Sequence, residues 1–141
     1  MTECIFCKII EKNIPAEIVY DDEDVIAFLD INPVHPGHAL VMPKQHIEKF
    51  VDVPPDQCKN LAGVIQKIMK SLTGELGYDG VNLIQNNGTA AGQIVPHLHF
   101  HVIPRKTGDG FAHWHGRGYA DGESALWAAK MRSAIESSGA A

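Results

Sequence analysis

The sequence predicts an α+β fold in which one long helix packs against an antiparallel sheet. Five short strand patterns occur in runs of three and two, and one long helical pattern separates the two runs. The chain has 141 residues, of which 45% are hydrophobic, so it fits one domain over residues 1–141 with an ordinary core. Because strands and helices do not alternate along the chain, the pattern argues against a doubly wound parallel sheet.

The first part of the chain predicts a short helix over residues 6–11, followed by three strands. The helix ends ahead of Pro15, because the residue before a proline avoids the helical conformation. Four acidic residues, 21–24, form a turn between the first two strands, and prolines and a glycine over residues 33–37 precede the third. These strands are predicted over residues 18–20, 25–29 and 38–42.

A long helix is predicted to begin at Pro54-Pro55-Asp56 and to end at Gly74 or Gly77. Its apolar residues recur at spacings of four and three, which indicates a face packed in the core and not a cofactor site. These residues are Leu61, Ile65, Ile68 and Leu72.

The rest of the chain predicts two more strands and a second helix. The strands are expected over residues 81–84 and 97–103, and Pro104 closes the second of them. The helix is predicted over residues 125–135, and the small-residue tail, 137–141, is expected to fray.

The composition excludes several classes of partner. With 12 basic and 17 acidic residues the formal net charge is −5, so nucleic acids and anionic membranes are not expected to bind. No apolar run approaches the roughly 20 residues of a membrane span, and the N-terminus does not read as a secretory signal. Three cysteines are an odd number, which argues against a disulfide framework and for a cytoplasmic location.

Three histidines alternate with large apolar residues over residues 97–103. In a strand, His97, His99 and His101 would share one face, and the residues between them would share the other. Three interpretations are open: a polar outer face of the sheet, a metal site, and nucleophilic catalysis by the central histidine. The preceding amide- and glycine-rich loop, residues 86–93, favours catalysis, because backbone N–H groups and the Gln93 amide can hold an anion.

The segment Gly92-Gln93-x-Val95-x-His97-x-His99-x-His101-Val102-Ile103-Pro104 resembles the signature of the histidine triad (HIT) nucleotide-binding family. The resemblance covers about residues 4–104, because four upstream segments match as well. These are residues 4–10, 14–15, 27–33 and 38–44. It implies a five-stranded antiparallel sheet with one long and one short helix, and a homodimer in which two sheets form one continuous ten-stranded sheet.

The same resemblance implies hydrolysis or transfer at the α-phosphate of purine nucleotides such as AMP, GMP and their derivatives. His99 corresponds to a nucleophile that forms a covalent nucleotidyl-imidazole, and His101 to a residue that contacts the phosphate and helps to protonate the leaving group. His97 and His38 correspond to supporting histidines. Asp30 corresponds to the ribose-binding carboxylate. The matching purine slot is Phe6, Ile9, Ile14, Phe28 and Ile31, with Phe28 and Ile31 expected on a strand, and the matching polar lip is Asn86, Gly92 and Gln93.

Three features bear on the branch of the family. Ile94 replaces a serine that donates to the leaving nitrogen in the phosphoramidase-like (Hint) branch, whereas Asn86 replaces a glutamine of the fragile-histidine-triad branch. Residues 104–109 resemble the dinucleotide-cleaving branch, and the charges of Arg105 and Lys106 could hold extra phosphates. We expect adenosine phosphoramidates or nucleotidyl amines as substrates. The alternatives are a dinucleoside polyphosphate hydrolase and a non-catalytic nucleotide-binding regulatory module.

The pair Cys4-x-x-Cys7 leaves three interpretations: a redox pair, two reduced buried thiols, or half of a zinc site. Resemblance to family members with the same paired cysteines implies zinc, with His46 and His97 as the other ligands. Such a zinc would be structural, because four protein ligands leave no open position. A rival enzyme class is a zinc hydrolase that uses the triad as ligands. His35, His113 and His115 have no assigned counterpart and are expected at the surface or the dimer rim.

Overall fold

The computed structural model describes residues 3–139, and the chain divides into two compact units, Met1–Asp109 and Gly110–Ala141. The first unit contains the sheet with two α-helices, and the second contains one helix. The elements are α1 (Ile5–Ile10), β1 (Ile18–Asp21), β2 (Val25–Leu29), β3 (Ala39–Pro43), α2 (Pro55–Thr73), β4 (Gly80–Gln85), β5 (Phe100–Arg105) and α3 (Glu123–Gly139), with short 3₁₀ turns at Phe50–Asp52 and Thr89–Ala91.

The five strands form one antiparallel sheet in the order β1-β2-β3-β5-β4. The predicted α+β class and the five-stranded antiparallel sheet are therefore confirmed. β5 lies between β3 and β4, so the strand that carries His101 is an inner strand, paired on both sides at Leu40 and Ile84. This pairing fixes the backbone on which the last histidine of the triad is presented.

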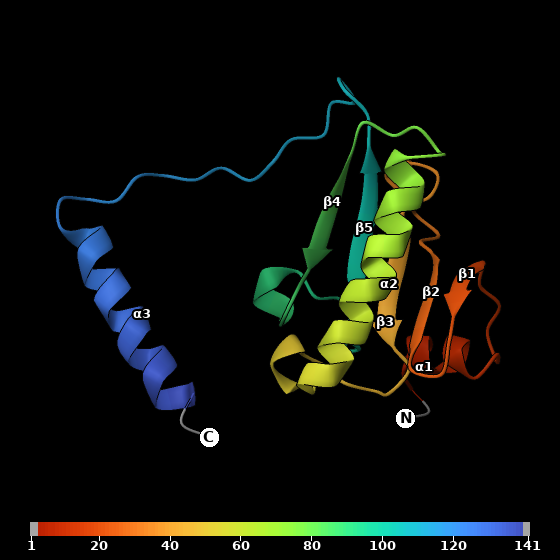
Figure 1. The fold of residues 1–141 in the computed structure, drawn as a ribbon, viewed down its shortest axis with the longest axis horizontal. Coiled ribbons are helices and arrows are strands. Elements are labelled where there is room, and N and C mark those ends of the chain that lie inside the picture. Colours follow the sequence, from red (N-terminus) through yellow and green to blue (C-terminus); the bar gives the residue numbers. More distant parts are fainter. Residues whose placement is uncertain (1–2, 140–141) are drawn as a thin grey trace. The chain divides into compact units, whose positions relative to one another are not determined.

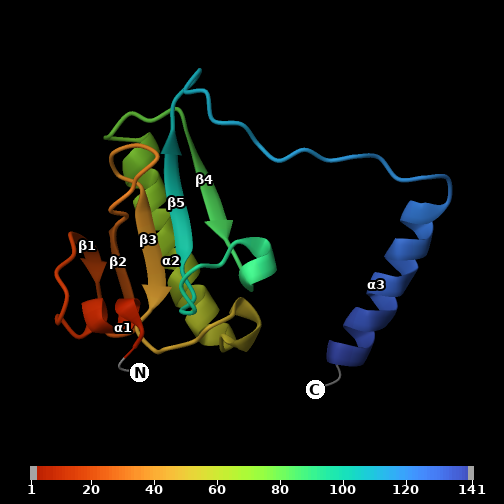
Figure 2. The same ribbon diagram turned by 180° about the vertical axis from the view of Figure 1, so that it is seen from behind.

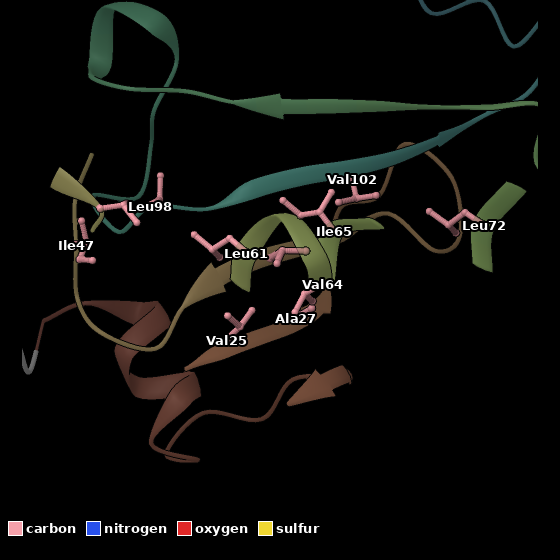
Figure 3. Close-up of a cluster of buried hydrophobic side chains, with 11 residues drawn as sticks. Val25, Ala27, Ile47, Leu61, Val64, Ile65, Leu72, Leu98 and Val102 are labelled. Atoms are coloured by element: carbon pink, nitrogen blue, oxygen red, sulfur yellow. The ribbon is translucent and has the colours of Figure 1, made fainter. Parts of the chain in front are cut away.

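Helix α2 covers one face of the sheet, as Figures 1 and 2 show from opposite sides. The predicted stripe provides Leu61, Ile65 and Leu72 to a buried cluster with residues of β2, β3 and β5 (Figure 3). Leu98 and Val102 belong to this cluster, and Phe100 packs against it. The apolar residues between the histidines therefore face α2, as the alternation predicts.

A second buried cluster lies on the opposite face of the sheet, against α1. Alternate residues of β2 and β3 divide between the two faces, so that Ile26 and Phe28 face α1 while Val25 and Ala27 face α2. The α1 cluster consists of Cys4, Phe6, Cys7, Ile9, Ile26, Phe28, Leu40 and Met42. This is also the face on which the histidines lie.

The last strand differs from its predicted bounds. It begins at Phe100, not at His97, and it continues through Pro104 to Arg105. Ahead of Phe100 the chain bends, and the Leu98 amide donates to the carbonyl of Ile47 at 2.7 Å instead of joining the ladder. Proline has no N–H to donate to a neighbouring strand. Pro104 is tolerated within β5 because β3 pairs only as far as Val102, so that β4 is the single strand beside Pro104.

In the second unit, residues 110–120 have no regular structure, and α3 is longer than the predicted 125–135. Ser137 and Ser138 continue the helix instead of fraying, while residues 140–141 of the predicted tail lie outside the described residues. Within residues 3–139, none of the helices is both long and apolar enough to cross a membrane.

We expect Leu61→Ala to lower the free energy of unfolding by about 2–5 kcal/mol, because Leu61 is only 1% exposed and its loss leaves a cavity between α2 and the sheet. Urea unfolding followed by circular dichroism measures this. Gln66→Ala, on the exposed side of the same helix, is the matched control and should change stability by less than about 0.5 kcal/mol. Equal effects of the two substitutions would contradict the packing of α2 described above.

Candidate functional site

A cavity of about 500 Å³ opens on the α1 face of the sheet, between α1, the ends of β2 and β3, and the segment that leads into β5. It brings together nine of the predicted catalytic and nucleotide-binding residues, which lie far apart in the sequence. They are Phe6, Ile9, Ile14, Phe28, Asp30, Ile31, Gly92, His99 and His101. The size suits a small-molecule ligand, and apolar residues predominate at one end, as is usual for such sites.

The apolar end is built from α1 and β2. The Phe6 and Phe28 rings meet edge to face with centroids 5.6 Å apart, and both residues are buried. Ile31 was expected on a strand, but β2 ends at Leu29 and Ile31 is 91% exposed. The chain turns there because Asp30 Oδ1 accepts the Asn32 N–H at 2.8 Å. Ile31 therefore borders the cavity from its rim.

The backbone determines which nitrogen of His99 carries the proton. His99 Nδ1 lies 2.7 Å from the carbonyl oxygen of His97, and a carbonyl only accepts, so Nδ1 must donate. In the neutral imidazole this leaves Nε2 with its lone pair. The Phe6 ring meets the His99 ring edge-on, with centroids 5.0 Å apart, and packs against it. His99 can therefore act as a nucleophile through Nε2.

Two further imidazoles have their protons assigned by the same logic. The Val34 N–H donates to His38 Nδ1 at 3.1 Å, so His38 carries its proton on Nε2. His38 Nε2 then donates to His101 Nδ1 at 3.0 Å. His101 is consequently protonated on Nε2. His38 and His101 thus form a hydrogen-bonded chain that leaves His101 Nε2 as a donor.

Burial keeps this pair of histidines neutral. It lowers the pKa of His38, although Asp30, whose Oδ2 is 3.5 Å from His38 Nε2, acts in the opposite direction. Burial, and then the neighbouring His99 and His38, lowers the pKa of His101 to about 4. At neutral pH His101 is therefore a neutral donor and not an imidazolium acid.

The ligand atoms of Asp30, His38 and His101 lie within 4.8 Å of one another, which resembles a metal site. The hydrogen bonds described above already occupy the atoms concerned, however. His38 Nε2 holds a proton because Nδ1 accepts from Val34, and His101 Nδ1 accepts that proton. A metal would need the proton of His38 to leave Nε2. The geometry of these three residues thus favours hydrogen bonding over a metal ion.

Two predicted residues of the polar lip do not line the cavity. Both amide hydrogens of Gln93 are donated to carbonyls, of Glu48 at 2.9 Å and of Val95 at 3.2 Å. Its oxygen accepts the Gly88 N–H at 2.8 Å, so the buried Gln93 side chain holds the loop together and is not directed at a ligand. Gly92 does line the cavity, with φ +91°, a conformation that favours glycine. The Asn86 side chain lies next to Gly92, where a Cβ atom on Gly92 would be 3.6 Å from Asn86 Nδ2.

Cys4, Cys7, His46 and His97 converge beside the cavity, with all four ligand atoms within 4.8 Å of one another. Cys7 Sγ lies 3.3 Å from His46 Nδ1 and 3.6 Å from His97 Nδ1, and Cys4 Sγ lies 3.5 Å from His97 Nδ1. A tetrahedral zinc with usual bond lengths requires a sulfur–nitrogen separation of about 3.6 Å. The residues therefore fit a zinc ion.

The surroundings of this group also suit a metal. His97 Nε2 donates to the carbonyl of Pro43 at 2.8 Å, which directs the lone pair of Nδ1 at the two cysteines. The Cys7 N–H donates to Cys4 Sγ at 3.4 Å, as backbone amides do around metal-bound thiolates. Without a cation, burial and the neighbouring Cys4 raise the pKa of Cys7 to about 11, so thiolates here need a positive partner.

Residues 104–109 lie away from the cavity. Arg105 donates two hydrogen bonds to Asp109, each 2.7 Å long, and one to Asn82, so its charge is neutralised by Asp109.

His35, expected at the surface or dimer rim, is half-buried and forms a hydrogen bond with the same Asp109 at 3.0 Å. Sequence patterns missed this cluster, because 74 residues separate His35 from Asp109. His113 and His115 are exposed in the second unit.

A family model described as the HIT domain matches residues 11–108. An uncharacterized HIT-like protein of Methanocaldococcus jannaschii is 54% identical over 107 residues, which are 76% of this chain and 82% of that protein. An adenosine 5'-monophosphoramidase of Schizosaccharomyces pombe is 40% identical over 72% of this chain and 74% of its own. An adenylylsulfatase of Arabidopsis thaliana is 38% identical over 76% of this chain and 54% of its own.

Solved structures show the same similarity. The crystal structure of a HIT family protein from Bacillus subtilis has a TM-score of 0.85 at 39% identity, with 93% of this chain and 96% of that chain covered. A zinc-bound histidine triad family protein from Mycobacterium smegmatis has a TM-score of 0.73 at 37% identity, with 94% and 98% covered.

The low pKa of His101 predicts that stability falls in acid. Between about pH 6.5 and pH 4 the unfolded chain binds a proton at this position and the folded chain does not, so unfolding becomes easier as pH falls. We expect His101→Asn to reduce the pH dependence by up to ~1.4 kcal/mol per pH unit in this window. Urea unfolding of both proteins at several pH values measures the difference. Parallel pH profiles would contradict a buried neutral His101.

Proposed function

The chain belongs to the HIT domain family, and on this basis we propose that it is a nucleotide hydrolase or transferase that cleaves at the α-phosphate of purine nucleotides. One observation carries the proposal: His99 lines the cavity, and the carbonyl of His97 holds its Nδ1 proton at 2.7 Å, so the lone pair is on Nε2. We expect adenosine phosphoramidates or related nucleotidyl amines as substrates.

The proposed reaction has two steps on His99. Nε2 attacks the α-phosphorus, the bond from phosphorus to the leaving nitrogen breaks, and the amine departs with a proton from water. A second water then attacks the phosphorus and gives a proton to the hydroxide left by the first step, the bond to Nε2 breaks, and the nucleoside monophosphate is released. His101 donates its Nε2 hydrogen to the phosphoryl group throughout, since it stays neutral at neutral pH. Its part is therefore charge stabilisation, not proton transfer.

The remainder of the cavity provides nucleotide binding. The slot between Phe6, Ile9 and Phe28 suits a flat purine, and Asp30, at the junction of this slot and the histidines, suits the ribose hydroxyls. Relatives named adenosine 5'-monophosphoramidase and adenylylsulfatase support an adenylyl group with a variable leaving group.

Zinc is proposed as a structural metal held by Cys4, Cys7, His46 and His97. It would fasten α1 to the segment ahead of β5, and thereby fix the carbonyl of His97 that orients His99. The metal takes no part in the chemical steps, because its four protein ligands leave no position for a substrate.

We also propose a cytoplasmic homodimer. β4 is an edge strand of six residues without a bulge, and it exposes Leu83 and Ile84, so it can pair with the same strand of a second copy and extend the sheet. The other edge, β1, is shorter and its pairing is irregular. The free cysteines Cys4, Cys7 and Cys58 suit a reducing compartment.

Loss of the nucleophile tests the main proposal. We expect His99→Ala to reduce turnover of adenosine 5'-phosphoramidate by more than about 10⁴-fold, while AMP binding by calorimetry stays within about threefold. Rapid quench and denaturing mass spectrometry should show one added nucleotidyl group on the wild type only. An adduct that persists in His99→Ala would refute the assignment, and a wild type that binds AMP without turnover would identify a regulatory module.

Metal analysis tests the zinc proposal. We expect one zinc per chain in native mass spectrometry, and Cys7→Ser should lose the metal and lower the thermal midpoint. Cys58→Ser is the matched control, because Cys58 lies on α2 outside the group and should keep the metal. A metal-free folded protein with Cys4 and Cys7 freely alkylated would show two ordinary buried thiols.

The leaving group separates the two enzyme candidates. Ile94 is 91% exposed at the rim of the cavity and cannot donate, whereas Arg105 is occupied by Asp109 and lies elsewhere. We expect a higher kcat/KM for adenosine 5'-phosphoramidate than for diadenosine tetraphosphate. Ile94→Ser should raise phosphoramidate turnover by about 2- to 13-fold, the value of one neutral hydrogen bond. A clear preference for the tetraphosphate would favour the dinucleoside polyphosphate hydrolase.

A further inference from the structure

The segment between β2 and β3 sets the protonation of His38 through one backbone group. The Val34 N–H donates to His38 Nδ1 at 3.1 Å, and the His38 amide donates to the carbonyl of His35, also at 3.1 Å. A displacement of this segment would remove the donor that keeps the proton of His38 on Nε2. His101 would then lose the hydrogen bond that keeps its own proton on the opposite nitrogen.

Side-chain hydrogen bonds tie this segment to the residues just before β4 and just after β5. His35 Nε2 donates to Asp109 Oδ2 at 3.0 Å, and Tyr78 OH donates to the carbonyl of Pro36 at 2.5 Å. The His35 and Tyr78 rings are also near neighbours, with centroids 6.0 Å apart. Figures 1 and 2 both show the end of β5 and the start of β4 beside the segment that enters β3. Residues at the ends of β4 and β5, outside the cavity lining, thus hold the loop that contains Val34 and His38.

Asp109 is the fixed point of this arrangement. Its side chain is 7% exposed and accepts from Arg105 Nε and Nη2, both at 2.7 Å, and from the Lys106 N–H at 3.2 Å. A bidentate guanidinium–carboxylate pair is short and directional. A third bond, from Arg105 Nη1 to Asn82 Oδ1 at 2.7 Å, fastens the pair to β4. The position of His35 therefore follows that of β4 and β5.

The described residues that line the nucleotide cavity include neither His35 nor Asp109 nor Arg105. These residues can affect a reaction there only through the segment that they hold. The path runs from Asp109 to His35, then along the backbone to the adjacent Val34, whose N–H donates to His38. Loss of the hydrogen bond between His35 and Asp109 would therefore change where His38 and His101 carry their protons, although neither His35 nor Asp109 lines the cavity.

We propose that His35 and Asp109 are positioning residues for catalysis: Asp109, held by Arg105, anchors His35 so that the Val34 N–H keeps His38 protonated on Nε2 and His101 able to donate from its own Nε2. The inference rests on the proposed function, since a misplaced proton on His101 slows the reaction only if His101 donates to the phosphate.

The test compares two substitutions at one position in the full-length, zinc-loaded protein. His35→Phe keeps a planar ring but removes the donor to Asp109, and His35→Gln restores an N–H donor. We expect His35→Phe to lower kcat for adenosine 5'-phosphoramidate about tenfold, with KM and AMP affinity within about twofold. His35→Gln should recover most of the loss. Asp109→Asn, which keeps the shape and one acceptor oxygen, should lower kcat in the same direction and serves if His35→Phe does not fold.

A spectroscopic readout separates positioning from general loosening. Nitrogen-15 NMR of the imidazoles should show His38 protonated on Nε2 alone in the wild type and in His35→Gln, and a mixture of tautomers in His35→Phe. Wild-type kcat with unchanged tautomers in His35→Phe would overturn the proposal, as would equal losses in the Phe and Gln variants. If the wild type itself shows no turnover, the proposed function fails, and the tautomers of His35→Phe still decide the positioning of His38.

Discussion

The hydrogen bond from His99 Nδ1 to the carbonyl of His97 is the interaction on which the site depends. It is one of three cases in which a backbone group, whose role as donor or acceptor cannot change, determines where an imidazole carries its proton. The Val34 N–H does this for His38, and the Pro43 carbonyl does it for His97. As a result the lone pair of His99 is on Nε2, at the cavity, and the lone pair of His97 is on Nδ1, at the cysteines. A site made of four histidines is ambiguous in principle, and the backbone removes the ambiguity.

The same short segment links the core, the cluster of Cys4, Cys7, His46 and His97, and the cavity. Leu98 is fully buried under α2, and the two residues beside it, His97 and His99, point to the other face of the sheet. Because Leu98 anchors the segment, His97 and His99 are held although they precede the regular part of β5. Packing in the core and geometry in the site therefore cannot vary independently.

Much of this could be predicted from the sequence, because periodicity reports which side chains share a face. The alternation over residues 97–102 placed the histidines opposite α2, and the spacing of Leu61 and Leu72 identified the buried side of the helix. The role of Gln93, the exposure of Ile31 and the pairing of His35 with Asp109 were not predictable. Each depends on a hydrogen bond or turn whose partner is set by the tertiary fold. The residue type indicates which hydrogen bonds a side chain can donate or accept, but the tertiary fold determines which partner atoms lie within reach.

The charge of the cavity constrains its substrate. Among the described residues that line it there is no Lys or Arg, and Asp30 adds a carboxylate. In the proposed function an anionic phosphate would therefore be held by imidazole and backbone N–H groups, and the apolar slot would supply most of the binding energy. Each additional phosphate would add charge without adding a cation to meet it, since Arg105 is already neutralised by Asp109 at 2.7 Å. For the function proposed above, such a cavity would favour a nucleotide with one phosphate and a small or uncharged leaving group. The acidic net charge of −5 acts in the same direction, because it raises the cost of every further negative charge on the ligand.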